Sequence, residues 1–345
     1  ASCLVGSEMC IRDRAKAILD SMTEEEKVAQ MFIVRCPDTA AKDVALKYQF
    51  GGYILFARDF KERDKQQMVA AIQEYQDVSK VPMFIGVDEE GGTVNRISLY
   101  KQYREVPFWS PRDLFDEGGM ELIKSDTKEK CRLLSSLGIN LNFAPVADIS
   151  SDPADYMYPR TFGTSAEETC KYVENVVSVM KENGIGSVLK HFPGYGNNSD
   201  THTGIAVDER SLRSLRENDF LPFESGIEAG AEVVLVSHNI VRSIDGEHPA
   251  SLSLQVHNIL RDEIGFSGLI ITDDLYMDAI REYTHGQEAA VMAVLAGNDL
   301  LCCSDYQTQY PAVVQALKDG KISDSRVDES VMRILQYKIS MGLMN

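Results

Sequence analysis

The sequence predicts a single (β/α)8 TIM-like barrel, and two observations support that prediction. Eight short apolar runs rich in β-forming residues recur along the chain, and they are nearly continuous in hydrophobicity, which is typical of strands buried on both faces. Stretches of helical character lie between them, and eight such alternations favour a barrel over a doubly wound sheet. The expected strands are MFIVRC (31–36), GYILFA (52–57), MFIGVD (83–88), LNFAPVAD (141–148), SVLKHF (187–192), VVLVSH (233–238), LIITDD (269–274) and DLLCCSD (299–305).

The expected helices fill the intervals between these strands. Thr23 and Glu26 have the spacing of a capping box and predict a helix that begins there. Gly138, Gly184 and Gly230 stand where helices would end, because glycine readily takes the left-handed conformation of a helix C-terminus. The helical stretches include 62–79, 120–137, 165–183, 210–229 and 286–296.

Length and charge narrow the classes of function. The chain has 345 residues and a net charge of −18, from 35 Lys+Arg and 53 Asp+Glu. No Pro/Ser/Gly-rich linker divides it, and barrels often run past about 250 residues as one domain. The chain lacks a basic stripe that could neutralise phosphates, so we expect neither a nucleic-acid partner nor an anionic membrane surface as partner. No apolar run approaches roughly 18 residues, so we expect no membrane span.

The first thirteen residues, ASCLVGSEMCIRD, differ from the rest of the chain. They show neither a helical period nor the basic and apolar regions of a signal peptide, and they resemble a translated sequencing adapter. We therefore expect a non-native leader over 1–13, organised sequence from about Arg14, and one barrel domain over 14–345. Seven cysteines without C-x-x-C spacing indicate buried thiols in a reducing compartment. They favour a location in the cytoplasm. If the leader stands in place of the native start, that start could have carried an export signal, so export stays an alternative.

Ionisable residues follow six of the eight apolar runs. The active sites of barrels lie at the carboxyl ends of the strands, so these side chains are expected to meet at one mouth. Such a set favours a site that binds a hydroxyl-rich molecule and performs acid–base chemistry. The six endings are Asp88-Glu89-Glu90, Asp148, Lys190-His191, His238-Asn239, Asp273-Asp274 and Asp305.

The segment LKHFPGYGNNSDTHTG (189–204) carries the clearest catalytic pattern. After a strand that ends in Lys-His, a proline and two glycines force a loop that carries Asp200 and His202. In an extended Asp-x-His segment both side chains point the same way, so Asp200 can hydrogen-bond one imidazole nitrogen of His202. The other nitrogen then remains free as a general acid/base near neutral pH. The alternative is a surface loop with an incidental histidine.

The segment GFSGLIITDDLYMDAI (265–280) offers a candidate nucleophile. Consecutive residues at a strand end face opposite ways, so one of Asp273 and Asp274 can enter the barrel mouth. A carboxylate placed there could attack an anomeric carbon. The alternative is that both cap the following helix, which explains Asp274 better than Asp273.

Two further segments suggest ligand contacts. In GVDEEGGTVNRI (86–97), Asp88 and Arg96 could clamp vicinal hydroxyls around a Gly-Gly turn. YPRTFG (158–163) puts Arg160 in a loop after the fourth strand, with an ordinary exposed arginine as the alternative. Three histidines, His191, His202 and His238, fall on the expected mouth, but no metal-ligand spacing such as H-x-H accompanies them, and Lys190 would add positive charge beside a metal. We expect no metal and, without a nucleotide-binding glycine loop, no other cofactor.

Together KHFPGYG…DTH, VDEEGGTVNR, YPRTFG and GFSGLIITDDLYM resemble the bacterial β-N-acetylhexosaminidases of glycoside hydrolase family 3, from about Thr23 to Gly342. The resemblance implies that Asp273 is the nucleophile and that His202 is the acid/base, oriented by Asp200. It also implies a set of residues that hold the hydroxyls and the N-acetyl group of the sugar: Asp88, Arg96, Arg160, Lys190 and His191. The chain departs from many members at Tyr195, where they carry a second histidine, and in a loop one residue shorter before Asp200.

The implied reaction is retaining hydrolysis of terminal β-linked N-acetylglucosamine, in peptidoglycan fragments or chito-oligosaccharides, through a glycosyl-enzyme. A histidine acid/base places no negative charge beside the incoming nucleophile, so phosphorolysis is one alternative. A β-glucosidase of the same family and a non-catalytic sugar-binding barrel are the others. We expect a monomer whose partner is the carbohydrate substrate.

Overall fold

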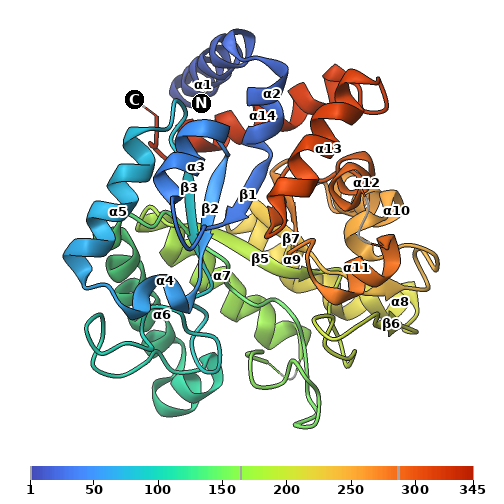
Figure 1. Ribbon diagram of the computed structural model, residues 1–345. Helices are drawn as coiled ribbons and strands as arrows, with labels where there is room; N and C mark the ends of the chain where they lie inside the picture. The colour runs from blue at the N-terminus through green and yellow to red at the C-terminus, as the bar shows by residue number, and fades with distance from the viewer. Residues whose placement is uncertain (1, 164, 286–287, 345) are drawn as a thin grey trace.

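The computed structural model describes residues 2–163, 165–285 and 288–344. Its main sheet has eight parallel strands in the order β10-β1-β2-β3-β4-β5-β7-β9, and a parallel bridge between Ile271 and Leu300 joins the two ends of this order. The sheet thus closes into a barrel inside a ring of helices (Figure 1), which confirms the predicted (β/α)8 fold. The strands are β1 (Phe32–Arg35), β2 (Gly52–Leu55), β3 (Phe84–Val87), β4 (Leu141–Asn142), β5 (Gly186–Phe192), β7 (Val233–Val236), β9 (Leu269–Thr272) and β10 (Leu301–Cys303).

The helices begin and end largely as their capping residues predict. Thr23 and Glu26 form the expected capping box, in which the Thr23 side chain accepts from Glu26 N and the Glu26 carboxylate accepts from Thr23 N. Gly138 ends α6 with a φ of 84°. The helices are α1 (Ser2–Ser21), α2 (Glu24–Gln30), α3 (Ala41–Tyr48), α4 (Ala57–Lys61), α5 (Lys65–Asp77), α6 (Pro111–Leu137), α7 (Ala166–Glu182), α8 (Leu212–Ser214), α9 (Phe220–Glu228), α10 (Leu254–Asn258), α11 (Asp278–Thr284), α12 (Ala289–Ala296), α13 (Tyr306–Lys318) and α14 (Asp324–Ser340).

Some elements differ from the prediction. The expected helix 120–137 is the second part of α6, because Gly119 has a non-helical backbone (φ 65°, ψ −161°) and forms a kink. The first part of α6 was not predicted; Ser110 caps it and Pro111 occupies its first turn, where a missing N–H is harmless. The expected helix 210–229 divides into α8, a π-helical segment and α9. The small parallel sheet of β6 (Val207–Asp208) and β8 (Ile240–Val241) was not predicted, because two-residue strands leave no periodic signal.

The N-terminal segment is helical from Ser2, although its sequence shows no helical period. Helix α1 begins at Ser2 and lies beside α14. Among its described side chains, Ala15 and Leu19 are buried and Ile11 and Ile18 pack against the core, whereas Met9 is 63% exposed. The non-native origin of residues 1–13 stays a prediction.

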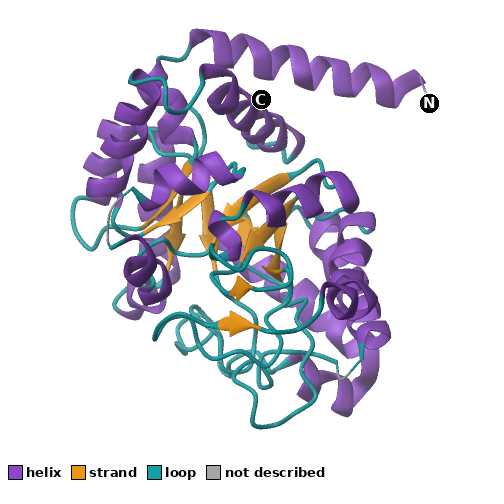
Figure 2. Ribbon diagram, turned by 90° about the vertical axis from the view of Figure 1, so that its right-hand side faces the viewer, coloured by secondary structure: helices purple, strands orange, loops and turns teal. Residues whose placement is uncertain are grey.

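The two ends of the barrel have different roles. Figure 2 shows loops gathered at one end and α1 at the other. At the amino end of the strands, the fully buried Lys338 of α14 donates to Gln30 Oε1 (2.8 Å) and to Gly51 O (2.9 Å). Within the described residues, no helix has the length and apolarity to cross a bilayer. The loop end, where the strands terminate, is where barrels carry their sites.

Candidate active site

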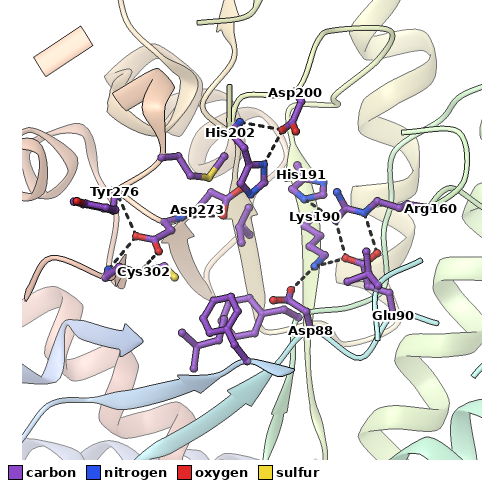
Figure 3. Close-up of a pocket in the computed structure, with 18 of the residues that line it drawn as sticks. Asp88, Glu90, Arg160, Lys190, His191, Asp200, His202, Asp273, Tyr276 and Cys302 are labelled. Carbon is purple, nitrogen blue, oxygen red and sulfur yellow. Dashed lines mark hydrogen bonds and ion pairs between the residues drawn. The ribbon is translucent and has the colours of Figure 1, made fainter. Parts of the chain in front are cut away.

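A cavity of about 820 Å³ opens at the carboxyl ends of the strands, a volume suited to a small ligand such as a sugar. It collects residues from many strand ends and the loops that follow them (Figure 3). All eight residues predicted for the site border this cavity: Asp88, Arg96, Arg160, Lys190, His191, Asp200, His202 and Asp273.

A network of buried ion pairs forms one wall. Lys190 Nζ lies 2.8 Å from Asp88 Oδ1 and 2.6 Å from Glu90 Oε1. Arg160 meets the same Glu90 in a bidentate pair, with Nη2–Oε1 at 2.7 Å and Nε–Oε2 at 3.0 Å. Arg160 is only 12% exposed, so it is a pocket residue and not the ordinary surface arginine that its loop position allowed. These pairs connect the ends of β3 and β5 to the loop after β4 (Figure 3).

The charges of this wall hold one another ionised. Burial acts to raise the pKa of Glu90, but Arg160 and Lys190 outweigh it and hold that pKa well below its usual range. Burial acts to lower the pKa of Lys190, but Asp88 and Glu90 raise it above its usual value. The wall therefore presents paired, fully charged groups to a ligand at neutral pH.

His191 is fixed by contacts to both of its ring nitrogens. Nδ1 lies 2.7 Å from Asp148 Oδ2, and Nε2 lies 3.4 Å from Arg160 Nη2. A guanidinium can only donate, so Nε2 is the acceptor and Nδ1–H donates to Asp148. Asp148 Oδ2 also accepts from the His191 backbone N at 3.2 Å. The buried Asp148 thus fixes both the tautomer and the orientation of this ring.

Arg96 reaches the cavity on a loop organised by Glu89. The fully buried Glu89 carboxylate accepts from the backbone N–H groups of Arg96, Ile97 and Ser98 at 2.8–3.1 Å. Arg96 Nη2 lies 4.0 Å from Asp88 Oδ2, so these two residues form a loose ion pair beside the cavity.

The predicted Asp200–His202 hydrogen bond is present, but in a turn, in which Thr203 N donates to Asp200 O at 3.1 Å, and not in the extended segment that was expected. His202 Nδ1 lies 2.7 Å from Asp200 Oδ1, and the same oxygen accepts from His202 N at 2.9 Å. The His202 side chain is 61% exposed and the Asp200 side chain 26% exposed, so the pair stands at the rim of the cavity (Figure 3). Since Nδ1 is engaged by Asp200, Nε2 is the nitrogen left for proton exchange.

The two aspartates after β9 have different environments. Asp273 borders the cavity. Its backbone N donates to Val236 O at 3.2 Å, and its Oδ1 accepts from Asp274 N at 2.8 Å. Burial acts to raise the pKa of Asp273, but three nearby histidines, His238, His191 and His202, lower it below its usual value. Asp274 accepts from Tyr276 N and Ser304 N, both at 3.0 Å, and so fastens the turn to the end of β10.

Five of the strand-end residues expected at the mouth do not line the cavity: Glu89, Asp148, His238, Asn239 and Asp305. His238 is 0% exposed and does not border the cavity. Its Nε2 lies 3.0 Å from Asp274 O, a carbonyl that can only accept, so Nε2–H donates and Nδ1 accepts from Ser251 Oγ at 2.7 Å. Burial lowers the pKa of His238, and its two hydrogen bonds hold the ring against the Asp274 backbone. Asp305 also lies outside the cavity lining and begins α13 as its N-cap residue.

Sequence reasoning did not assign roles to Glu90 and Asp148, although it placed both at strand ends. Each acts through a residue that was assigned: Glu90 through Arg160 and Lys190, Asp148 through His191. The available signal was a carboxylate at the end of a wholly apolar run. Among the side chains that the structure describes, no group of three or more His, Cys, Asp or Glu is arranged to hold a metal ion.

Comparison with known proteins agrees with this geometry. The profile described as "Glycosyl hydrolase family 3 N terminal domain" matches residues 23–337. The chain belongs to glycosyl hydrolase family 3. It is 31% identical over 332 residues to the beta-hexosaminidase LpqI of Mycobacterium tuberculosis, which covers 92% of this chain and 83% of the relative. A beta-hexosaminidase of Psychromonas ingrahamii is 30% identical over 282 residues, 78% of this chain and 80% of that protein.

Solved structures give the same result. The family 3 beta-N-acetylglucosaminidase of Paenibacillus sp. str. FPU-7 superposes with a TM-score of 0.86 at 29% identity, over 94% of this chain and 63% of that one. The M. tuberculosis LpqI structure superposes with a TM-score of 0.83 at 28% identity, over 93% and 95% of the two chains. The chain therefore spans less than two thirds of the Paenibacillus protein. The sequence resemblance to family 3 glycoside hydrolases of the β-N-acetylhexosaminidase type is confirmed.

Proposed function

We propose that the protein hydrolyses terminal, non-reducing β-linked N-acetylglucosamine with retention of configuration. The observation that carries the proposal is the 2.7 Å pair between His202 Nδ1 and Asp200 Oδ1 at the rim of the cavity that Asp273 also borders. A carboxylate and a separate acid/base at one pocket are the two groups that a retaining glycosidase needs. The names of the curated relatives support N-acetylhexosamine as the sugar.

In the first step, an Asp273 oxygen forms a bond to the anomeric carbon as the bond to the leaving-group oxygen breaks. His202 Nε2 gives its proton to that oxygen, and Asp200 stabilises the orientation of the ring. In the second step, His202 takes a proton from water, and the water oxygen displaces Asp273. The lowered pKa of Asp273 keeps it ionised and able to attack throughout the neutral range.

The wall of buried ion pairs would hold the sugar. Asp88 and Lys190 offer an acceptor and a donor for hydroxyl groups, and Arg160 and His191 extend this surface. Arg96 approaches Asp88 from the neighbouring loop. We assign these five residues to binding, because their charges are already balanced by protein partners and a neutral sugar needs no counter-charge.

Two substitutions test the mechanism. We expect His202→Ala to lower kcat/KM by about 10²–10⁴-fold on a disaccharide, which needs protonation of the leaving group, and much less on an activated aryl glycoside. Equal losses of kcat/KM on both substrates would contradict the assignment of His202 as the general acid. We expect Asp273→Asn to abolish the covalent intermediate that a fluorinated sugar traps, whereas persistent trapping would move the nucleophile to Asp274.

The chain provides a matched control for the histidine variant. His248 Nδ1 lies 3.0 Å from Asp245 Oδ2, so this is a second Asp–His pair, but neither residue borders the cavity. We expect His248→Ala to leave both substrates unaffected.

Product analysis separates the proposal from its alternatives. Turnover of nitrophenyl N-acetylglucosaminide but not of the glucoside favours the N-acetylhexosaminidase over a β-glucosidase. Formation of a sugar 1-phosphate when phosphate is added would instead identify a phosphorylase.

A further inference from the structure

We propose that Tyr195 is a positioning residue that fixes the place of the Asp200–His202 pair relative to the wall of buried ion pairs. The inference rests on the proposed function, because it assigns Tyr195 a role through His202. Tyr195 stands three residues after Phe192, the last residue of β5, and five residues before Asp200. In this loop Asn197 and Ser199 are exposed, whereas Tyr195 is only 3% exposed.

The Tyr195 hydroxyl makes three contacts with the segment that carries the pair. It accepts from Thr201 N at 2.9 Å, lies 3.0 Å from Thr201 Oγ1 and donates to Ser199 O at 3.3 Å. A phenol has one proton and can accept two hydrogen bonds, so these contacts are mutually compatible when Thr201 Oγ1–H donates. Burial raises the pKa of Tyr195, which keeps the phenol protonated and able to donate.

Thr201 is the residue through which this contact acts. It is 1% exposed and lies between Asp200 and His202, whose side chains are 26% and 61% exposed. Within the described chain, the further hydrogen bond at the Thr201 backbone runs from Ala279 N to Thr201 O at 3.3 Å. Fixing the buried residue between two exposed ones fixes the direction in which both side chains leave the backbone.

The other end of Tyr195 is attached to the sugar-binding wall. Its backbone N donates to Asp148 Oδ1 at 2.7 Å, and Asp148 Oδ2 holds His191. The Tyr195 ring lies edge-on to His191, with centroids 5.5 Å apart, and packs with Val146 and Met157 in a small apolar cluster separate from the main core. One residue thus joins His191, which is predicted to bind the sugar, to the segment of His202, which is predicted to protonate the leaving group.

This geometry makes Tyr195 a determinant of acid catalysis and not of binding. Tyr195→Phe removes the hydroxyl and leaves the ring and the Asp148 contact in place. The Asp200–His202 hydrogen bond can persist, but the segment that carries it loses its buried anchor. A misplacement of about 1 Å in a catalytic group can lower a rate by about 10²-fold. We therefore expect a loss only in steps that require His202.

The experiment compares kcat/KM for leaving groups of different acidity in four proteins: wild type, Tyr195→Phe, His202→Ala and the double variant. We expect Tyr195→Phe to lower kcat/KM by about 10–100-fold for the disaccharide and by less than about 3-fold for a dinitrophenyl glycoside. In the His202→Ala background, the same substitution should have no further effect on the disaccharide, because the group it positions is absent.

Two further variants serve as controls. Tyr53 is also fully buried and donates its hydroxyl to a backbone carbonyl, Ala41 O at 2.7 Å, but it does not contact the catalytic loop. Tyr53→Phe should leave the dependence on the leaving group unchanged. Thr201→Val removes one hydroxyl contact while the Thr201 N–H bond remains, and should reproduce the Tyr195→Phe pattern with a smaller loss even if Tyr195→Phe proves unstable.

The outcomes separate this inference from the proposed function. Wild type and His202→Ala alone test whether His202 is the acid. If His202→Ala shows the expected dependence on the leaving group, then equal losses for both substrates in Tyr195→Phe, or multiplicative losses in the double variant, overturn the role of Tyr195. If His202→Ala shows no such dependence, the proposed function and this inference both fail.

Discussion

Glu90 balances two cations at once, so its replacement by glutamine is a direct test of the paired wall. In wild type its two oxygens make three contacts of 2.6–3.0 Å with Lys190 and Arg160. Glu90→Gln leaves Arg160 without its bidentate carboxylate, while Lys190 keeps Asp88 at 2.8 Å. Breaking a buried ion pair by removing one partner costs about 3–5 kcal/mol. Since Lys190 retains one partner, we expect a loss near the lower end, about 3 kcal/mol.

The assay is denaturant unfolding of wild type and Glu90→Gln at several pH values. Because the pKa of Glu90 is lowered in the folded state, the stabilisation is complete above the ordinary value of 4.5 and is lost as the pH falls toward the folded-state pKa. The difference between the two proteins should therefore shrink by about 1.4 kcal/mol per pH unit below about pH 4.5.

A surface ion pair supplies the control. Glu129 meets Arg104 through Nε (2.9 Å) and Nη2 (3.3 Å), but its side chain is 54% exposed. Glu129→Gln should change the free energy of unfolding by less than about 1 kcal/mol. A difference of less than about 1 kcal/mol for Glu90→Gln at pH 7, or one that does not change with pH, would show that the wall is not held by this carboxylate.

Two further predictions concern pH. Burial lowers the pKa of Lys338 from its usual 10.5 to about 7. Between these two pH values the amine is protonated in the unfolded chain but not in the folded one, so the free energy of unfolding rises with pH in that window. Relative to Lys338→Met, wild type should gain about 2 kcal/mol between pH 7 and 9, and a constant difference would contradict the buried, largely neutral amine. His238 and His191 also lower the pKa of Asp273 and remain in His202→Ala, so the activity of this variant on an activated glycoside should not change between pH 5 and 8. An acidic limb that persists in this variant would mean that Asp273 titrates there.

Much of the fold could be predicted from the sequence, because strands buried on both faces leave continuous apolar runs. All eight expected runs contain a strand of the barrel. The run 141–148 forms only the short strand Leu141–Asn142, because Pro145 lacks a backbone N–H and the chain leaves the regular ladder before it. The first half of helix α1 was not predicted, because its apolar residues do not recur at helical spacing. The helix lies beside α14, and that contact cannot be read from the local sequence.

The site residues could be predicted where a short local pattern carried them. Asp200 and His202 are two positions apart, so a local turn brings them together, although the prediction assumed an extended segment. Glu90 and Asp148 were not assigned, because their partners come from other strands and depend on how the barrel closes. His238 was placed wrongly for the same reason: the chain direction put it at a strand end, but its ring turns beneath the Asp273 loop.

The two sides of the pocket differ in how they are built, and this difference bears on inhibition. The Lys190–Glu90–Arg160 wall is assembled from buried ion pairs across strand ends, whereas His202 stands exposed on a loop. A sugar-shaped inhibitor that contacts only the wall would keep its affinity when the loop is altered. Substitutions that loosen the loop would then reduce turnover without conferring resistance.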